Sequence, residues 1–256
     1  MQVYCGLDIG TGKVTAEERG QVPHYGLDLV QPDEPFDAAD FIELADTLIA
    51  SHPRVVVAGG TSLYLRSIVR GLVPTPPVDP AVRARFEELA DPHTALAEVD
   101  PALAERLHPN DRKRLVRGLE VHALTGTRLS ELQAAHAAMP DRVHAEALWL
   151  DRDDLSERIN ARVHAMMADG YLSEVRRLLD AGFARTIKPM QSLGYRHLAD
   201  HTLDGLPLDE AIRRTQRDTR RFARKQRNWM RRLGWPRILP DHGPAVQAAA
   251  ELLWGT

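Results

Sequence analysis

Cysteine is almost absent from this 256-residue sequence, which contains Cys5 alone. A single cysteine excludes an intrachain disulfide and a metal site built from several cysteines, and it is typical of a reducing compartment. No run of about 18 apolar residues is present, so the sequence predicts no transmembrane helix. The N-terminus also lacks the basic and then apolar layout of a signal peptide. We therefore expect a soluble, cytoplasmic protein.

The charge of the chain is unevenly distributed. The formal net charge is −3, yet the segment 212–232 carries ten Arg or Lys residues against one acidic residue, Asp218. Phe222, Trp229 and Met230 are interspersed among them. Clustered basic side chains bind phosphates without sequence preference, and aromatic side chains stack on bases or anchor a helix. The segment predicts a nucleic-acid-binding helix, with a solvated basic helix as the alternative.

Three short apolar runs have the character of strands, at 54–58, 146–150 and 237–239. The first is β-branched and ends at Gly59-Gly60, which suits a strand buried on both faces of a parallel sheet. A helical pattern over Ala38–Ser51 precedes it. This alternation predicts an α/β fold.

Prolines at positions 74, 76, 77 and 80 mark a stiff boundary, because they can neither continue a helix nor fill a central strand. Helical patterns follow at 81–89, 102–107 and 112–124, with Gly126 as the expected stop of the last. We therefore predict three parts: an N-terminal part of the core at 1–77, an all-helical insertion at 78–140, and the rest of the core at 141–256.

A further helix is expected after Asp151, which is placed to cap it, and Gly170 is expected to end it. Arg158 and Arg162 lie four residues apart and therefore share a face of this helix. Together they suit an anion. The alternative is a pair of solvated arginines beside nearby carboxylates.

The segment Gly59-Gly60-Thr61 follows the first predicted strand and opens a helix. Glycines there let a ligand approach the backbone, and a helix N-terminus offers unpaired N–H groups to an anion. The hydroxyl of Thr61 is placed to touch such a ligand. An ordinary glycine-containing turn is the alternative.

A second glycine-rich stretch, GTGK at 10–13, is not a nucleotide-binding P-loop. That motif needs a glycine five residues before the Gly-Lys pair and a Ser or Thr after it. Leu7 and Val14 occupy those places. A loop with Thr11 and Lys13 still suits a phosphate or an RNA backbone.

His197 and His201 have the spacing of the two histidines in zinc hydrolases, but no glutamate follows the first and no third ligand is evident. We predict no metal site there.

Several of these segments occur together, in the same order, in one known family. The sequence resembles the bacterial tRNA dimethylallyltransferases over essentially its whole length. The resemblance rests on MQVYCGLDIGTGK at 1–13, His24 with PDEP at 32–35 and ADF at 39–41, GGTSLY at 59–64, VDPAVRARFE at 78–87, LHPNDRKRLVRGLEV at 107–121, LGYR at 193–196 and TRRFARKQRNWMR at 219–231.

The resemblance implies a P-loop-kinase-like α/β core with a helical insertion that clasps the anticodon stem-loop of tRNA. It implies a monomer that uses Mg²⁺ and transfers a dimethylallyl group from dimethylallyl diphosphate to the exocyclic amine of the adenosine 3′ of the anticodon. Such an allylic displacement needs cations and N–H groups around the departing diphosphate and the exclusion of water. The adenine must also leave its stack.

The resemblance also implies roles for particular residues. Thr61 would act at the reacting centre. The diphosphate would lie against Gly59, Gly60, Arg158, Arg162 and Lys13, without a choice between the two arginines. The residues that would contact tRNA are Met1, Gln2, Arg83, Lys113, Arg114, Leu115, Val116, Arg117, Gln191, Gly194, Tyr195, Arg196, Arg224, Lys225, Gln226, Trp229 and Arg231.

The sequence departs from the family at its start. Members carry a GPTxxGKT loop and a general-base aspartate ahead of the MQVY-like stretch, and neither is in this chain. Loss of a general base costs ~10²–10⁴-fold in rate. One interpretation is that Met1 is an internal methionine of a longer enzyme, and the other is a shortened chain that binds tRNA without catalysis. A small-molecule kinase relative is a third, against which the basic segment 212–232 argues.

Overall fold

The computed structural model describes residues 1–239 together with residues 247 and 251. The chain divides into two compact units, one of Met1–Ile68 with His144–Thr256 and one of Val69–Val143. We call the first the core unit and the second the insert unit. The predicted insertion, 78–140, lies within the insert unit.

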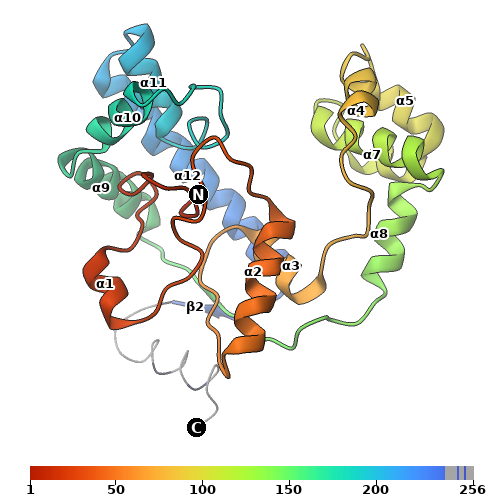
Figure 1. Cartoon of the computed structure of the whole chain (residues 1–256), viewed down its shortest axis with the longest axis horizontal. Coiled ribbons are helices and arrows are strands. Elements are labelled where there is room, and N and C mark those ends of the chain that lie inside the picture. The colour runs from red at the N-terminus through yellow and green to blue at the C-terminus, as the bar shows by residue number, and fades with distance from the viewer. Residues whose placement is uncertain (240–246, 248–250, 252–256) are drawn as a thin grey trace. The chain divides into compact units, whose positions relative to one another are not determined.

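The insert unit consists of five helices (Figure 1). They are α4 (Pro80–Glu87), α5 (Pro92–Val99), α6 (Pro101–Arg106), α7 (Arg112–Thr125) and α8 (Leu129–Ala137). Three of them begin in the same way, with an aspartate as the N-cap and a proline as the first helical residue: Asp79, Asp91 and Asp100 each accept backbone N–H bonds. Both residue types favour helix starts for local reasons, so these boundaries are encoded in the sequence.

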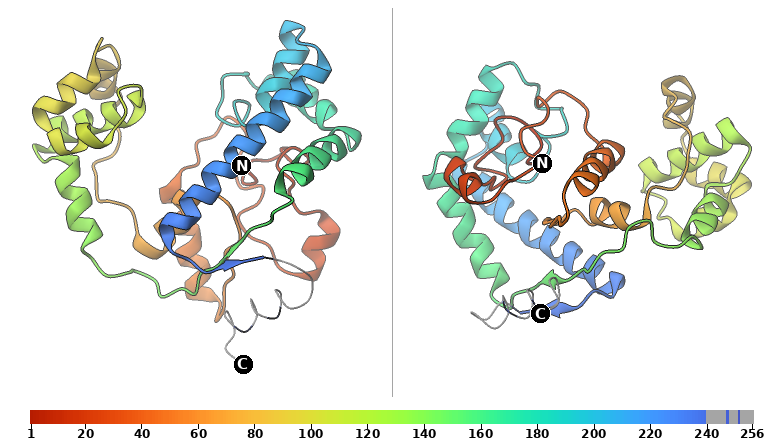
Figure 2. Two further views of the ribbon diagram at one scale, coloured as in Figure 1. Left: turned by 180° about the vertical axis from the view of Figure 1, so that it is seen from behind. Right: turned by 60° about the horizontal axis from the view of Figure 1, so that its bottom comes forward.

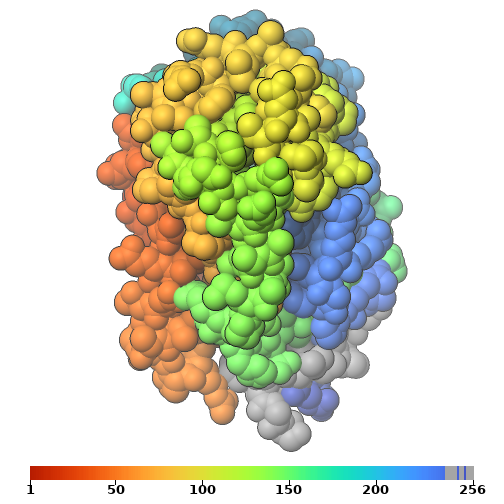
Figure 3. All heavy atoms as spheres, turned by 90° about the vertical axis from the view of Figure 1, so that its right-hand side faces the viewer, coloured from red at the N-terminus to blue at the C-terminus, as the bar shows by residue number. Residues whose placement is uncertain are grey.

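The helices of the insert unit bury a leucine-rich core. Leu96, Leu103, Leu115 and Leu119 are its centre, and the space-filling view shows the yellow and green helices in close contact (Figure 3). Gly126 ends α7 with a φ of 71°, a conformation that glycine adopts at little cost. The stop predicted at Gly126 is therefore confirmed.

The core unit contains helices and one short parallel sheet. Its elements are α1 (Ala16–Gln21), α2 (Ala38–Ser51), α3 (Ser62–Arg70, whose last two residues belong to the insert unit), β1 (Trp149–Leu150), α9 (Leu155–Ala168), α10 (Tyr171–Asp180), α11 (Tyr195–Asp204), α12 (Leu208–Leu233) and β2 (Arg237–Ile238). Strand β1 pairs with β2 in parallel, with Trp149 opposite Arg237 and Leu150 opposite Ile238. The 26-residue helix α12 packs against α9 and α11 (Figure 2).

The strand predicted at 54–58 is wrong for the described structure. Residues 54–58 have no assigned secondary structure, and Val56 is 63% exposed. A β-branched run forms a strand only where another backbone takes up its N–H and C=O groups. The described residues supply no such partner. The predicted runs at 146–150 and 237–239 do form strands, but each strand is only two residues long.

Asp151 is not the cap of α9, contrary to our prediction. Asp154 occupies the N-cap position. The carboxylate of Asp151 is buried and instead accepts hydrogen bonds from Arg227 Nε at 2.6 Å and Arg237 Nε at 2.9 Å. Asp151 therefore connects the end of β1 to α12 and β2.

Candidate functional site

The glycine-rich turn before α3 lies beside the basic helix α12. The carbonyl of Gly60 accepts a hydrogen bond from Gln226 Nε2 at 2.8 Å. Thr61 is exposed where α3 begins, and its carbonyl accepts from Leu65 N at 3.1 Å, within the first turn. Gly59 is open, because a Cβ added there would meet no atom within 4 Å. The structure thus places Gln226 beside Gly60, from which it is 166 residues distant in the sequence, and so near the neighbouring Thr61.

Glu174 of α10 binds the backbone of the loop that carries GTGK. The Glu174 carboxylate accepts the backbone N–H of Asp8 at 2.9 Å, of Ile9 at 2.7 Å and of Gly10 at 3.1 Å. These are the donors that a phosphate-binding loop would point at its ligand. They are already engaged, so residues 8–10 do not form a phosphate cradle.

The ammonium group of Lys13 is also engaged in hydrogen bonds within the protein. Its buried ammonium donates to the carbonyl of Tyr4 at 2.8 Å, to Asp8 Oδ1 at 2.7 Å and to Asp28 Oδ1. Hydrogen bonds from Lys13 and Arg19 lower the pKa of Asp28, although desolvation raises it. This geometry argues against the role in diphosphate binding predicted for Lys13.

The far end of the same loop meets two of the predicted substrate residues. Gln2 Nε2 donates to the carbonyls of Thr11 at 3.2 Å and Gly12 at 3.0 Å. The guanidinium of Arg162 lies against Gly12, where a Cβ would be 1.8 Å from Arg162 Nη2. Arg158 is exposed one turn earlier on α9. Of these two exposed arginines, Arg162 is the one that lies against the loop, and the choice between them for the diphosphate stays a prediction.

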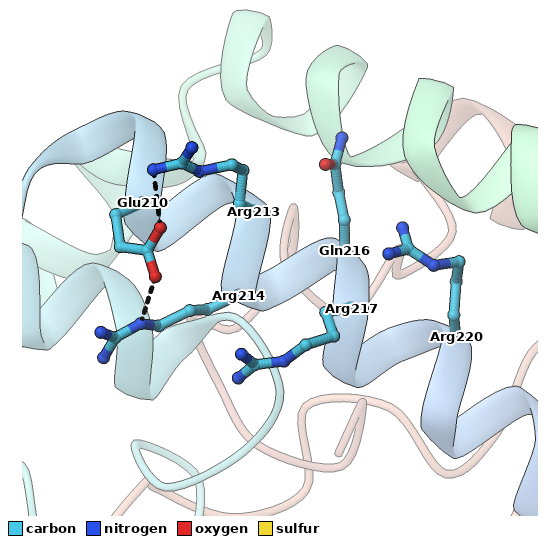
Figure 4. Close-up of a pocket in the computed structure, with 6 residues that line it drawn as sticks. All are labelled: Glu210, Arg213, Arg214, Gln216, Arg217 and Arg220. Atoms are coloured by element: carbon cyan, nitrogen blue, oxygen red, sulfur yellow. Dashed lines mark hydrogen bonds and ion pairs between the residues drawn. The ribbon is translucent and has the colours of Figure 1, made fainter.

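A cavity of about 380 Å³ opens along the first half of α12. Four arginines and one carboxylate line it together with Gln216: Arg213, Arg214, Arg217, Arg220 and Glu210 (Figure 4). Glu210 accepts from Arg213 Nη2 at 2.7 Å and from Arg214 Nε at 2.9 Å. Glu210 and, through its bond with Arg217, Asp218 neutralise part of this charge, and the four guanidinium groups still leave a positive surface that fits a polyanion.

Asp218 is the buried anchor of α12. It accepts hydrogen bonds from Arg196, from Arg217 Nε at 3.0 Å and, across a 3.1 Å contact, from His197 Nε2. Desolvation raises its pKa, but the hydrogen bonds from Arg217, His197 and Arg196 outweigh that and lower the pKa to about 2. Burial lowers the pKa of His197. Part of the charge of Arg196 is therefore neutralised by Asp218 within the fold.

This anchor predicts two steps in acid unfolding. The pKa of His197 is lower in the folded state than its ordinary value of 6.5. The contribution of neutral His197 to the free energy of unfolding is therefore lost as the pH falls below 6.5. The contribution of Asp218 is complete above 3.8 and is lost as the pH falls toward 2. Asp218→Asn should lower the free energy of unfolding at pH 7 by about 1.5–3 kcal/mol. It should also reduce the decrease in the free energy of unfolding between pH 4 and 2, as measured by urea unfolding followed through tryptophan fluorescence. An unchanged pH profile would contradict this.

The second half of α12 presents the basic residues that were expected to contact RNA. Arg224, Lys225 and Arg231 are exposed, and Trp229 is half-buried. Arg227 differs, because its guanidinium donates to Asp151 and to the carbonyl of Arg152. Position on the helix, not residue type, separates the two groups.

Four of the insert-unit residues expected at the RNA are engaged in the fold. Glu120 is fully buried and accepts from Arg83 Nη2 at 2.7 Å and from Arg117 Nη1 at 2.8 Å. Leu115 and Val116 lie in the core with no side-chain surface to offer. The structure therefore contradicts a side-chain contact with RNA for these two residues. Lys113 and Arg114, both exposed, remain the candidates in this unit.

The LGYR segment has mostly structural contacts. Tyr195 is buried and its hydroxyl donates to Glu174 Oε1 at 2.6 Å. Gly194 lies against the hydroxyl of Tyr171, and Gln191 is exposed. Tyr195 therefore offers no side chain to RNA in this structure, whereas Gln191, Met1 and Gln2 keep some exposed surface.

The two histidines with hydrolase-like spacing have other partners. His197 contacts Asp218, and His201 Nδ1 lies 2.6 Å from the carbonyl of Leu206. Among the residues that the structure describes, no group of three or more His, Cys, Asp or Glu side chains is placed to hold a metal ion. Within the same part of the chain, no helix is long and apolar enough to cross a membrane.

The sequence did not indicate the buried roles of Glu174, Glu120 or Asp151, of which Asp151 was predicted only as a helix cap. Each is an acidic residue among buried apolar neighbours, such as Tyr171, Val175 and Leu178 around Glu174 on α10. An acidic residue on the apolar face of a predicted helix is the signal that would have singled out Glu174.

The chain is similar to known proteins in sequence and in structure. The family described as IPP transferase matches residues 2–233. A tRNA dimethylallyltransferase of Anaeromyxobacter dehalogenans is 50% identical over 256 residues, covering 94% of this chain and 83% of the relative. One of Syntrophobacter fumaroxidans is 46% identical over 243 residues, covering 90% and 71%.

Solved structures of known proteins share the fold of this chain. A tRNA isopentenylpyrophosphate transferase from Staphylococcus epidermidis superposes with a TM-score of 0.67 at 29% identity, covering 98% of this chain and 86% of the other. A eukaryotic dimethylallyltransferase acting on tRNA superposes with a TM-score of 0.79 at 24% identity, covering 98% and 69%. The predicted α/β fold with a helical insertion is confirmed.

Proposed function

The chain belongs to the IPP transferase family, and on that premise we propose that it transfers a dimethylallyl group from dimethylallyl diphosphate to tRNA. The acceptor is the exocyclic amine of the adenosine 3′-adjacent to the anticodon. The observation that carries the proposal is the hydrogen bond from Gln226 to Gly60, because the turn predicted to bind the diphosphate, which precedes Thr61, then lies beside the basic helix α12. A diphosphate site and an RNA surface must adjoin in such a reaction.

The chemistry is a displacement at the allylic carbon. The amine nitrogen forms the new C–N bond, the C–O bond to the diphosphate breaks, and the amine releases one proton. Negative charge grows on the departing diphosphate, so groups that stabilise it act in the transition state. Thr61 Oγ1, the backbone N–H groups at Gly59 and Gly60, and the guanidinium of Arg162 are the groups of this chain suited to that role, with Arg158 one turn away.

Recognition of the adenine falls to Gln2 in this proposal. Its Nε2 is held by two loop carbonyls, which leaves Oε1 as the polar atom able to accept from an adenine amine. In the core unit the RNA backbone would lie along Arg224, Lys225, Arg231 and Trp229 of α12. In the insert unit, Lys113 and Arg114 are the residues proposed to contact RNA. The adenine leaves its stack to reach the allylic carbon. The cytoplasm, where tRNA is found, is the proposed compartment.

Mg²⁺ is the proposed metal, but the described residues do not form a cage for it. Mg²⁺ usually keeps several waters and binds through one or two carboxylates and substrate phosphates. We therefore assign no step of the reaction to a protein-held ion, and expect the ion to accompany the diphosphate.

The test is transfer of radiolabelled dimethylallyl from its diphosphate to an unmodified anticodon stem-loop RNA in the presence of Mg²⁺. Thr61→Val should lower the transfer rate by ~10²–10³-fold, the range seen when one transition-state donor is removed. Thr47→Val is the matched control, because Thr47 bonds only its own helix at Glu43 and should leave the rate unchanged. RNA binding by the unmodified chain without any transfer would instead support a non-catalytic tRNA-binding protein.

A further inference from the structure

Glu174 is a buried acid that the proposed chemistry does not use. It is 3% exposed and sits on the inner face of α10 between Tyr171 and Leu178. A buried carboxylate is costly unless every lone pair is matched by a donor. Glu174 has four donors within hydrogen-bond distance: three backbone N–H groups and the hydroxyl of Tyr195.

Three of those donors belong to one loop, which fixes the loop in space. Asp8 and Ile9 share Oε2, and Gly10 takes Oε1. The ring of Tyr171 also packs against the loop, since a Cβ at Gly10 would lie 2.1 Å from Tyr171 Cε2. The loop is therefore held through its backbone, which leaves little freedom for its next residues, Thr11 and Gly12.

Thr11 and Gly12 are the residues that meet Gln2 and Arg162. Gln2 Nε2 bonds both of their carbonyls, and the guanidinium of Arg162 lies against Gly12. A shift of the loop by a fraction of an ångström would move both partners, one proposed for the adenine and one for the diphosphate. A misplacement of about 1 Å can lower a reaction rate by about a hundredfold.

We propose that Glu174 is a positioning residue, which sets the loop 8–12 and through it the places of Gln2 and Arg162. This inference rests on the proposed function. It differs from a purely stabilising role in what it predicts for binding: loss of the carboxylate should weaken diphosphate binding in molecules that are still folded.

Glu174→Gln is the variant that tests this, because it keeps the shape of the side chain. The carboxamide of glutamine has one acceptor oxygen, and its NH₂ group cannot accept a hydrogen bond. It therefore cannot accept all the loop N–H groups that now bond to the two carboxylate oxygens of Glu174. We expect amide hydrogen exchange at Asp8, Ile9 and Gly10 to accelerate at least tenfold. The Kd for inorganic pyrophosphate, measured by calorimetry, and the KM for dimethylallyl diphosphate should rise roughly tenfold, with a smaller change in kcat.

Tyr171→Phe is the matched control on the same helix. It removes one hydrogen bond, from Tyr171 Oη to the carbonyl of Leu193 at 3.1 Å, and leaves the loop's three bonds to Glu174 in place. Exchange at residues 8–10 and pyrophosphate affinity should stay within twofold of the unmodified chain, even if thermal stability falls as much as in Glu174→Gln.

The outcomes separate the inference from its premise. Equal pyrophosphate affinity in Glu174→Gln and the unmodified chain overturns the positioning role alone. Equal losses in Glu174→Gln and Tyr171→Phe also overturn it, because the cause would then be general loosening of the core. If the unmodified chain neither binds pyrophosphate nor transfers the allyl group, the proposed function fails, and the inference with it.

Discussion

Glu120→Ala should lower the free energy of unfolding of the insert unit by about 3–5 kcal/mol, the range for breaking a buried ion pair from one side. The substitution leaves the guanidinium groups of Arg83 and Arg117 without their shared carboxylate. The N–H of Asp79, which also bonds Glu120, loses its acceptor at 2.9 Å. Because α4 and α7 meet through this residue, the whole helical unit should loosen.

The insert unit, residues 69–143, contains no tryptophan, because the four tryptophans of the sequence are at positions 149, 229, 235 and 254. Urea unfolding followed by far-ultraviolet circular dichroism reports both units, and tryptophan fluorescence reports the core unit alone. In Glu120→Ala, the circular dichroism transition should shift to lower urea while the fluorescence transition stays in place. A shift of both would show that the loss is not local.

Acid should act on the same contact in the unmodified chain. Burial raises the pKa of Glu120, but hydrogen bonds from Arg117 and Arg83 outweigh it and lower the pKa below the ordinary 4.5. A carboxylate with a depressed pKa stabilises the fold above its ordinary pKa and loses that contribution as the pH falls through the folded value. The loss should therefore occur below pH 4.5. Arg114→Ala is the control for Glu120→Ala in the same insert unit. It removes only the exposed ion pair with Asp111, which contributes about 0–1 kcal/mol to the free energy of unfolding.

Removing the exposed charges of α12 should have the largest effect on RNA binding. Replacing Arg224, Lys225 and Arg231 with glutamine removes three proposed phosphate contacts. At about tenfold for each charge-assisted hydrogen bond, affinity for an anticodon stem-loop should fall roughly a thousandfold. The slope of log K against log salt should decrease by about one unit per contact. Fluorescence anisotropy titrations between low and physiological salt measure both quantities.

Two comparisons decide whether position on the helix matters. Arg176→Gln removes one exposed positive charge from α10 and should change RNA affinity less than twofold, whereas Arg224→Gln should change it about tenfold. Equal losses in these two single variants would mean that net charge, and not a defined surface on α12, attracts the RNA.

Local patterns predicted most of the helices correctly. Helix α2 has the predicted bounds Ala38–Ser51, and α7 begins at the predicted Arg112 and stops at Gly126. Asp-Pro starts, glycine stops and apolar spacing act over a few residues, so they can be recognised without the rest of the fold. The run at 54–58 shows the limit, because a strand depends on a partner that its own residues do not supply.

The division of the charged residues between RNA and fold could not be obtained from the sequence. Arg227 lies in the same basic segment as Arg224, yet it bonds Asp151, 76 residues away. Lys13 looks like a phosphate ligand beside two glycines, yet its ammonium is buried against Asp8 and Asp28. Nothing in the spacing of these residues indicates which carboxylate will pair with each of them.

The sequence by itself determined the family, the α/β class with its helical insertion, and the positions of the basic helix and the glycine turn. Those features depend on residue order and short-range periodicity. The tertiary structure alone decided that Glu174, Glu120 and Asp151 hold the loop, the insert unit and α12 in place. The reason is physical: a carboxylate is tolerated in the interior only where donors from distant segments converge on it, and that convergence exists only once the chain has folded.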